Sequence, residues 1–285
     1  MEIKPATTFE EQVNIMARHG LIIEDRAKAI QILNRTNYYT LSGYLHAFKN
    51  KDGGFGCDIT FDTMYNIYQC DKRFKNIILY ALDEIEQNLK TKIAYSLAHE
   101  IGAIGYLDAN NFRDEQEHKK FLIKFNKAVY RNKKLPFVKH HLSKYNGKFP
   151  IWVAVNLFTM GMIKHFYKNL NTPYQKQIAK YFNTGIRHLS SWIGSVVYLR
   201  NLAAHYMRLY NFKIQFTPLK NRHDSLSPTY KIFDIVYIMK YLILDKREWN
   251  VYILPVIEQI FDEYKGAITL SAYGFPNNWT NLLHI

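Results

Sequence analysis

The strongest constraint on how this chain folds is a run of apolar residues between Phe61 and Ile101 that recur at intervals of three and four. Because an α-helix turns once in about 3.6 residues, side chains at these intervals lie on one side of a helix. The members of the run are Phe61, Met64, Ile67, Tyr68, Phe74, Ile77, Ile78, Leu82, Ile85, Leu89, Ile93 and Leu97. The pattern predicts one long helix over residues 61–101.

Shorter helices are predicted before and after it. Thr8 and Glu11 have the spacing of a capping box, which begins a helix that ends at Gly20. Pro255 is expected to disturb the last predicted helix, because proline cannot donate a backbone hydrogen bond. The other predicted helices cover residues 24–34, 117–134, 150–170, a short segment from Thr172 and Pro173, 190–210 and two segments within 229–264. Only residues 212–218 have a strand-like pattern, so we predict a single all-α body.

Composition and patterning exclude several classes of protein. With 285 residues, 48% of them hydrophobic, the chain can bury a core and is not disordered. Cys57 and Cys70 make no disulfide framework. The longest strongly apolar run, residues 151–163, is too short to span a bilayer, and the first residues do not resemble a signal peptide, so we expect a cytoplasmic protein without a membrane partner. The segment at 51–58 is predicted to be a loop, and it lacks the Lys and Ser or Thr of a phosphate-binding loop.

The positive charge of the chain is concentrated in one segment. Between His118 and His223 there are 20 Lys and Arg residues and no Asp or Glu, whereas the whole chain carries +14, so the remainder carries −6. Such a block repels itself unless a polyanion binds to it, which favours a nucleic-acid partner over an ordinary solvated lysine-rich surface. The candidate RNA contacts within it are Lys133, Lys134, Lys139, His140 and Lys144.

The stretch YLRNLAAHYMRLYN at residues 198–211 combines strong polar side chains with no carboxylate. On a helix, Asn201, His205 and Arg208 would share one face, and Arg200 would reach round from the side. An Arg–His spacing of five is weak evidence alone. Arg113 and His118 have the same spacing, but the acidic residues between them make a phosphate site there improbable.

Five blocks of the sequence, in order, resemble Abi-type abortive-infection proteins of the AbiD/AbiF-like group, whose helical core belongs to the HEPN superfamily of ribonucleases. The blocks are TNYYTLSGYLHAF at 36–48, FDTMYNIYQCDKRFK at 61–75, LDEIEQNLKTKIAYSLA at 82–98, PIWVAVNLFTMGMIKHFYKNL at 150–170 and YLRNLAAHYMRLYN at 198–211. The resemblance covers about residues 8–213. The family often has two histidines where this chain has His205 and Tyr206. This chain therefore keeps the first of the two, the motif histidine, and has a tyrosine in place of the second.

The resemblance implies an all-α, HEPN-like helical bundle with additional N-terminal and C-terminal helices. Residues 1–60 would form an N-terminal helical region packed on the core, and residues 61–215 a core with a basic insertion and the Arg-x4-His motif. The resemblance does not cover residues 216–285, which the helices predicted within 229–264 make a C-terminal helical extension. The implied activity is that of a metal-independent endoribonuclease toxin in anti-phage abortive infection, with no cofactor.

The roles that this chemistry needs fit the motif residues. A histidine can move protons while the neighbouring 2′-OH of RNA attacks the phosphate, and a guanidinium can stabilise the phosphorane. His205 and Arg200 suit these roles, with Asn201 orienting the histidine or the phosphate and Arg208 holding the RNA backbone. The alternative is structural: Arg200 and Asn201 would bond other helices, and His205 would be a core histidine.

Several other polar residues could have either a structural or a functional role. Glu86 and Lys90 are predicted to form a helix salt bridge, although Glu86 could instead brace Arg200 or His205. Tyr206 is a supporting site residue. His140 and His141 lack the Cys or carboxylate neighbours that a metal site would need. The residues Tyr38, Tyr39, Ser42 and Tyr44 are predicted to pack and cap and not to form a site.

The expected partners are RNA and a second copy of the chain. One chain offers one such Arg–His pair, and HEPN sites are typically built from two motifs facing across a dyad. Ala203 and Ala204 would let a second helix approach closely. The main alternative function is that of a non-catalytic RNA-binding partner that holds a structured small RNA, such as a small non-coding RNA antitoxin. A DNA-binding repressor is a weaker alternative, because no helix-turn-helix is evident.

Overall fold

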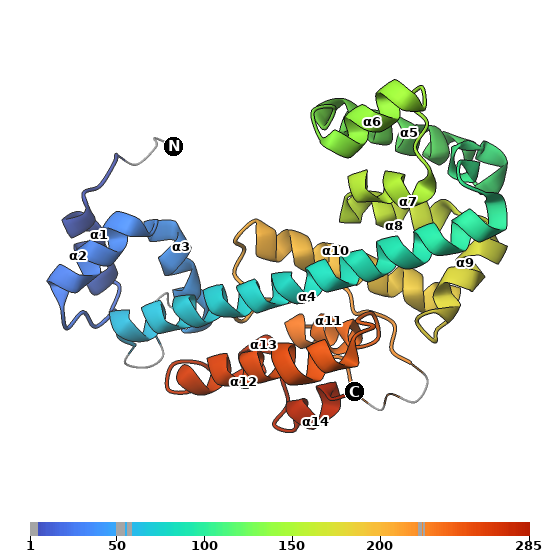
Figure 1. Ribbon diagram of the computed structural model, residues 1–285. Helices are drawn as coiled ribbons and strands as arrows, with labels where there is room; N and C mark the ends of the chain where they lie inside the picture. Colours follow the sequence, from blue (N-terminus) through green and yellow to red (C-terminus); the bar gives the residue numbers. More distant parts are fainter. Residues whose placement is uncertain (1–4, 50–54, 56–58, 222–223, 225) are drawn as a thin grey trace.

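The structure, a computed structural model, describes residues 5–49, 55, 59–221, 224 and 226–285. Its longest element is α4 (Phe61–Ile101), which runs through the middle of the molecule (Figure 1). Of the twelve apolar residues predicted to share one face of this helix, eleven are buried and Tyr68 is half-buried. Thr60 caps the helix, because its hydroxyl accepts a hydrogen bond from the backbone of Thr63. The predicted long helix is therefore confirmed.

The remaining elements are also helical, and the described residues form isolated bridges but no strand. The α-helices are α1 (Phe9–Arg18), α2 (Arg26–Arg35), α3 (Tyr38–Ser42), α5 (Glu115–Arg131), α6 (Pro136–Lys144), α7 (Ile151–Ala154), α8 (Met160–Asn169), α9 (Thr172–Lys180), α10 (Ile186–Ala204), α11 (Ile232–Met239), α12 (Leu254–Glu263), α13 (Leu270–Tyr273) and α14 (Trp279–Leu283). The shorter turns are η1 (Gly43–Ala47), η2 (Gly105–Leu107), η3 (Ala109–Asn111), η4 (Val155–Leu157) and the π-helix η5 (Glu248–Ile253). The all-α prediction is confirmed.

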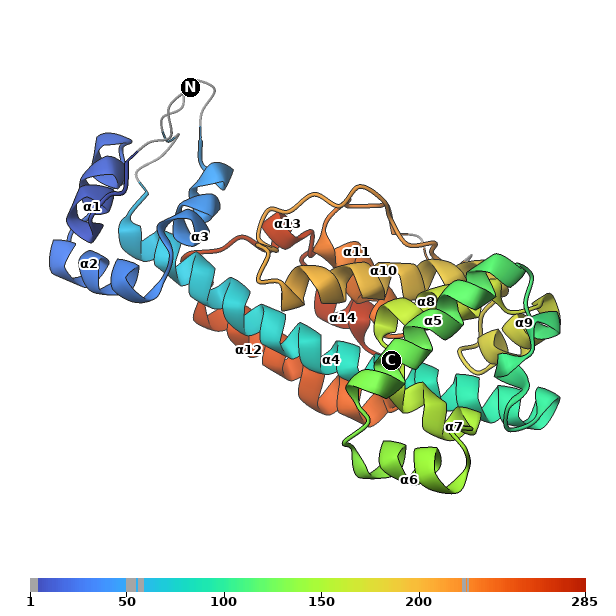
Figure 2. The same cartoon turned by 90° about the horizontal axis from the view of Figure 1, so that it is seen from above.

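The other helices are arranged along α4. Figure 1 shows α1 to α3 at its N-terminal end and α5 to α9 around its C-terminal end. The middle of α4 packs against α10 on one side and α12 on another, and Figure 2 shows α12 lying alongside it. One continuous buried core includes side chains from residues 1–60, 61–215 and 216–285. None of the described helices has the length and apolar character needed to cross a membrane.

Several helix boundaries differ from the predicted ones. Residues 150–170 form α7, η4 and α8 in place of one helix, because Thr159 starts a new helix by accepting a hydrogen bond from the backbone of Met162. The predicted helix at 190–210 is α10, which begins and ends earlier. The capping box of Thr8 and Glu11 is present.

The C-terminal third also departs from the expected pattern in two places. Residues 212–218 form no strand, and Ile214 instead donates a backbone hydrogen bond to Tyr230 at 2.9 Å. Pro255 does disturb its helix: the wider π-turn of η5 precedes it, and Pro255 lies in the first turn of α12. The predicted loop at 51–58, with Cys57, lies outside the described residues except for Phe55.

Candidate functional site at the end of α10

The Arg-x4-His motif lies where α10 ends. Met207 donates a backbone hydrogen bond to Leu202 at 3.0 Å, and Tyr206 donates one to Ala203 at 3.2 Å. These two bonds form a Schellman motif, which closes a helix and satisfies its last carbonyl groups. Tyr206 takes the left-handed conformation that this motif requires, with φ of 56°. Helix α10 therefore stops at Ala204, and His205 is its C-cap.

Three of the predicted catalytic side chains are exposed at this helix end: Arg200, Asn201 and His205. Among the described residues, none of these side chains forms a hydrogen bond or ion pair with another part of the chain. The structural alternative, in which His205 is a core histidine, is therefore wrong. Ala203 is buried within its own chain, so only the half-buried Ala204 is partly open to a second helix.

A buried carboxylate, Asp71 of α4, holds the chain just after the motif. Its Oδ2 accepts hydrogen bonds from the backbone of Leu209 at 3.0 Å and from the hydroxyl of Tyr44 at 2.7 Å. Its Oδ1 accepts from the backbone of Tyr210 at 3.1 Å and from the hydroxyl of Tyr273 at 3.0 Å. Because Asp71 is fully buried, these four donors replace the water that a carboxylate otherwise binds.

Lys75, one turn further along α4, completes this network. Its Nζ lies 3.3 Å from Oδ2 of Asp71 and donates to the backbone carbonyl of Met207, also at 3.3 Å. Burial, followed by the charge of Asp71, raises the pKa of both Tyr44 and Tyr273 well above the usual range. Both hydroxyls therefore remain protonated donors, and we call Asp71, Lys75, Tyr44 and Tyr273 the Asp71 network.

Arg208 joins the motif segment to the N-terminal helices. Its Nη1 donates a hydrogen bond to the backbone carbonyl of Gly43, the first residue of η1, and its side chain is half-buried. The prediction that Arg208 shares a helix face with Asn201 and His205 is wrong, because the helix ends before both His205 and Arg208. Through Arg208 and the Asp71 network, segments far apart in the sequence meet at one place.

Glu86 is not part of this meeting point. It forms the predicted ion pair with Lys90, with 2.7 Å between Oε1 and Nζ. Glu86 lies 15 positions after Asp71 on α4, which is about 22 Å along the helix axis. Among the described residues no hydrogen bond joins it to Arg200 or His205. The alternative in which Glu86 braces the motif is therefore wrong, and the predicted salt bridge with Lys90 is confirmed.

The candidate RNA contacts lie elsewhere on the molecule. They occupy α6 and the turn between α5 and α6, and all are exposed: Lys133, Lys134, Lys139, His140 and Lys144. In Figure 1, α5 and α6 lie towards the end of α4 opposite α3, whereas the C-terminal end of α10 points towards α3. The fold thus separates these residues from the motif.

The positive charge of this region also acts on a histidine of α8. Burial lowers the pKa of His165, and the charges of Lys124, Lys164 and Lys168 lower it further, against the opposing charge of Glu117. The lysines therefore outnumber the acidic groups that act on this ring.

The second Arg–His pair has structural contacts. Arg113 donates a hydrogen bond to the hydroxyl of Thr172 at 2.8 Å. His118 is buried, and its Nε2 lies 2.9 Å from the backbone oxygen of Tyr106. Within the described part of the chain, no three His, Cys, Asp or Glu side chains gather as metal ligands do.

Sequence analysis did not single out Asp71, although the sequence contains a signal for it. Asp71 lies four residues after Ile67 and three before Phe74, on the apolar face of α4, where a carboxylate is rarely buried without partners. Lys75 follows one turn later. Tyr273 carries no such signal, because its partner lies about 200 residues earlier.

Apart from Tyr273, the residues that meet at Asp71 lie within the region that a family comparison recognises. A family model described as Abi-like protein matches residues 31–211, which is 181 of the 285 residues. The chain belongs to the Abi-like protein family. The match ends one residue after Tyr210, the last residue bonded to Asp71 in this region. Membership of the Abi-like family suggests a role in abortive infection. No curated protein and no solved structure shows a significant match to the chain.

Proposed function

We propose that this Abi-like protein is a metal-independent endoribonuclease of the HEPN type that acts as a toxin in anti-phage abortive infection. The observation that carries the proposal is the exposure of Arg200, Asn201 and His205 together at one fixed helix end. Buried polar networks are costly unless they hold something in place, and here the Asp71 network fixes the backbone directly after the motif.

In the proposed reaction, the 2′-oxygen of one ribose attacks the adjacent phosphorus. The bond from phosphorus to the 5′-oxygen breaks, which leaves a 2′,3′-cyclic phosphate and a 5′-hydroxyl. His205 moves the protons that this exchange requires, and the Arg200 guanidinium stabilises the negative charge on the phosphorane. Asn201 orients the histidine or the phosphate by hydrogen bonding. All the bonding changes take place within RNA, so no metal-bound nucleophile is needed.

The proposal includes a homodimer. Arg200 lies within α10 and His205 is its C-cap, so one chain places a single Arg–His pair at this helix end. Two such ends that face each other across a dyad would supply both side chains to one phosphate. Tyr206 and Met207, next to the motif, are 78% and 49% exposed. Apolar side chains of this size beside polar ones favour a protein interface at the motif.

A second function is favoured by the separation of the basic residues from the motif. A chain that holds a structured small RNA on α5 and α6 without cutting it would need that exposed surface and not the end of α10. Such a partner would bind RNA with steep salt dependence and would show no activity that depends on His205.

One experiment distinguishes these functions. Purified protein is incubated with tRNA and mRNA in the presence of EDTA, and the product ends are identified. We expect cleavage with 2′,3′-cyclic phosphate and 5′-hydroxyl ends, loss of cleavage in His205→Ala, and unchanged RNA binding by that variant. His19→Ala, which removes the exposed histidine at the C-terminal end of α1, is the control. Equal cleavage of DNA, which lacks the nucleophile, would contradict the mechanism. Binding without cleavage by the wild type would favour the second function.

A further inference from the structure

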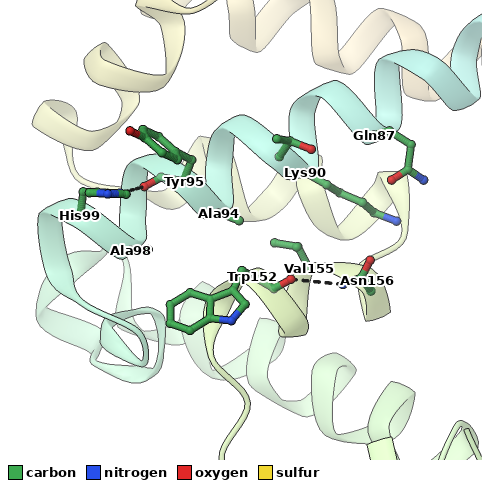
Figure 3. Close-up of a pocket in the computed structure, with 10 residues that line it drawn as sticks. Gln87, Lys90, Ala94, Tyr95, Ala98, His99, Trp152, Val155 and Asn156 are labelled. Atoms are coloured by element: carbon green, nitrogen blue, oxygen red, sulfur yellow. Dashed lines mark hydrogen bonds between the residues drawn. The ribbon is translucent and has the colours of Figure 1, made fainter. Parts of the chain in front are cut away.

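A pocket of about 500 Å³ lies between α4 and the α7–η4 segment, away from the end of α10. Its α4 wall includes Ala94, Tyr95 and His99, and its other wall includes Trp152 and Asn156. Figure 3 shows these side chains, with the ammonium of Lys90 extending towards Asn156. Ala94 lies 23 positions after Asp71 on α4, which is about 35 Å along the axis, so the pocket is separate from the motif.

The pocket presents aromatic rings to solvent. Trp152 is 54% exposed and Tyr95 is 57% exposed. The three other tryptophans, Trp192, Trp249 and Trp279, are all buried. Exposed aromatic faces beside small aliphatic residues such as Ala94 form a surface on which a flat, apolar ring can stack.

Hydrogen-bond acceptors are left free at the same pocket. The Asn156 amide nitrogen donates to the backbone carbonyls of Trp152 and Val153, each at 3.2 Å, which leaves its Oδ1 free to accept. His99 Nδ1 lies 2.8 Å from the carbonyl of Tyr95. Because a carbonyl only accepts, Nδ1 carries the proton in this bond, and Nε2 has no hydrogen-bond partner among the described residues. A flat ring that carries an N–H donor on its edge would complement these atoms.

The charge of the two pocket walls favours a negatively charged ligand. On α4, residues 87–99 contain Lys90 and Lys92 but no Asp or Glu, and the other wall belongs to the acid-free segment between residues 118 and 223. Glu86, which borders the pocket region, is neutralised by its ion pair with Lys90. Glu100 follows His99 directly, but none of the residues that line the pocket carries a carboxylate. A ring attached to a negatively charged backbone can therefore enter between walls that lack one.

From these features we propose that the pocket binds one unpaired nucleobase of an RNA strand, stacked on Trp152, with the phosphates of the strand directed towards the basic surface. The inference rests on the proposed function in taking RNA as the ligand, and it adds a recognition site distant from the cleavage motif. Adenine suits the site, because it combines a large stacking face with an exocyclic amine that can donate a hydrogen bond to Oδ1 of Asn156.

Trp152 provides its own readout, because it is the exposed tryptophan among four. The protein carries His205→Ala to prevent cleavage and is titrated with a short oligoadenylate RNA while tryptophan emission is followed. We expect the RNA to quench the emission, and we expect no quenching in Trp152→Phe. An abasic oligonucleotide of the same length supplies the phosphates without bases and should leave the emission unchanged.

Affinity is measured in parallel by the anisotropy of fluorescein-labelled RNA. Trp152→Ala should weaken binding roughly 5- to 150-fold, the range for losing one stacked base, whereas Trp152→Phe should keep most of the affinity. Tyr252→Ala, which removes an aromatic of similar exposure outside the acid-free segment, should bind as the starting protein does.

Each outcome supports or overturns the proposal. Unchanged affinity in Trp152→Ala, or equal quenching by the abasic strand, overturns the pocket assignment while leaving the proposed function intact if the wild type still cuts RNA. Base-dependent quenching without any cleavage by the wild type supports the pocket and overturns the nuclease. A fall in molar mass of Trp152→Ala in light scattering would show that the pocket holds a second copy of the chain, and this also overturns the proposal.

Discussion

At the scale of single residues, Asp71 is the side chain on which the geometry of the site depends most. It receives two backbone N–H groups from the segment after the motif and two tyrosine hydroxyls from opposite ends of the chain. A carboxylate can accept all four at once, because both oxygens act only as acceptors. No other side chain of this size could satisfy the same set of donors.

We therefore expect Asp71→Asn to lower the free energy of unfolding by about 3–5 kcal/mol, because it leaves Lys75 as an unpaired buried charge and replaces an acceptor with a donor. The change is measured by denaturant unfolding followed by circular dichroism. Adding Lys75→Met to Asp71→Asn should recover part of the loss. An Asp71→Asn protein as stable as the wild type would show that the network contributes little.

Tyr206 stores strain beside the motif histidine. A residue with a Cβ loses about 1–2 kcal/mol in the left-handed conformation, whereas glycine does not, although glycine gives the unfolded chain about 0.5–1 kcal/mol of extra freedom. Because the Tyr206 side chain is largely exposed, we expect Tyr206→Gly to raise the free energy of unfolding by up to about 1 kcal/mol. Tyr206→Ala keeps the Cβ and should bring no such gain. Thermal unfolding of both variants would measure the difference, and equal effects would argue against backbone strain.

At the scale of elements, local sequence determines that α10 forms, whereas tertiary contacts determine where it ends. The apolar pattern of the motif segment continues past Ala204, so sequence alone extends the helix to Tyr210. The helix stops because the next residues find better partners in Asp71 and Lys75 than in another helical turn. Tertiary contacts of this kind override local helix preference.

The exposed lysines of α6 allow a prediction about binding. We expect Lys139→Gln and Lys144→Gln each to weaken RNA binding and to reduce the slope of log affinity against log salt concentration by about 0.7, because each lysine releases counterions from the RNA. Lys246→Gln, an exposed lysine outside the acid-free segment, should leave the slope unchanged. Fluorescence anisotropy over a series of salt concentrations measures all three. Identical slopes would place the RNA on another surface.

At the scale of the whole molecule, the proposed shared site predicts that activity depends on association. Cleavage per chain should fall on dilution in step with dissociation of the dimer, because each phosphate would need Arg200 from one chain and His205 from the other. A wild-type chain paired with an Arg200→Ala, His205→Ala chain should be strongly impaired. Light scattering beside a cleavage assay measures both quantities. A monomer that cuts at full rate per chain would exclude the shared site.

Sequence by itself determined the helical character of the protein and its longest helix. The spacing of Phe61 to Leu97 and the capping pair of Thr8 and Glu11 are local, and helices are built from hydrogen bonds between near neighbours. The basic residues of α6 are exposed, as their charge alone predicts. The five blocks that carry the resemblance all lie within the residues that match the Abi-like family.

Only the tertiary structure decided where α10 ends, which residues surround the motif and what Arg208 contacts. Asp71 accepts hydrogen bonds from Tyr44, from Tyr273 and from the backbone of Leu209, and no local pattern relates positions so far apart in the sequence. Periodicity reports which side of a helix is buried, because burial follows from spacing along one element. It does not report which buried groups meet, since that depends on how distant elements pack together in three dimensions.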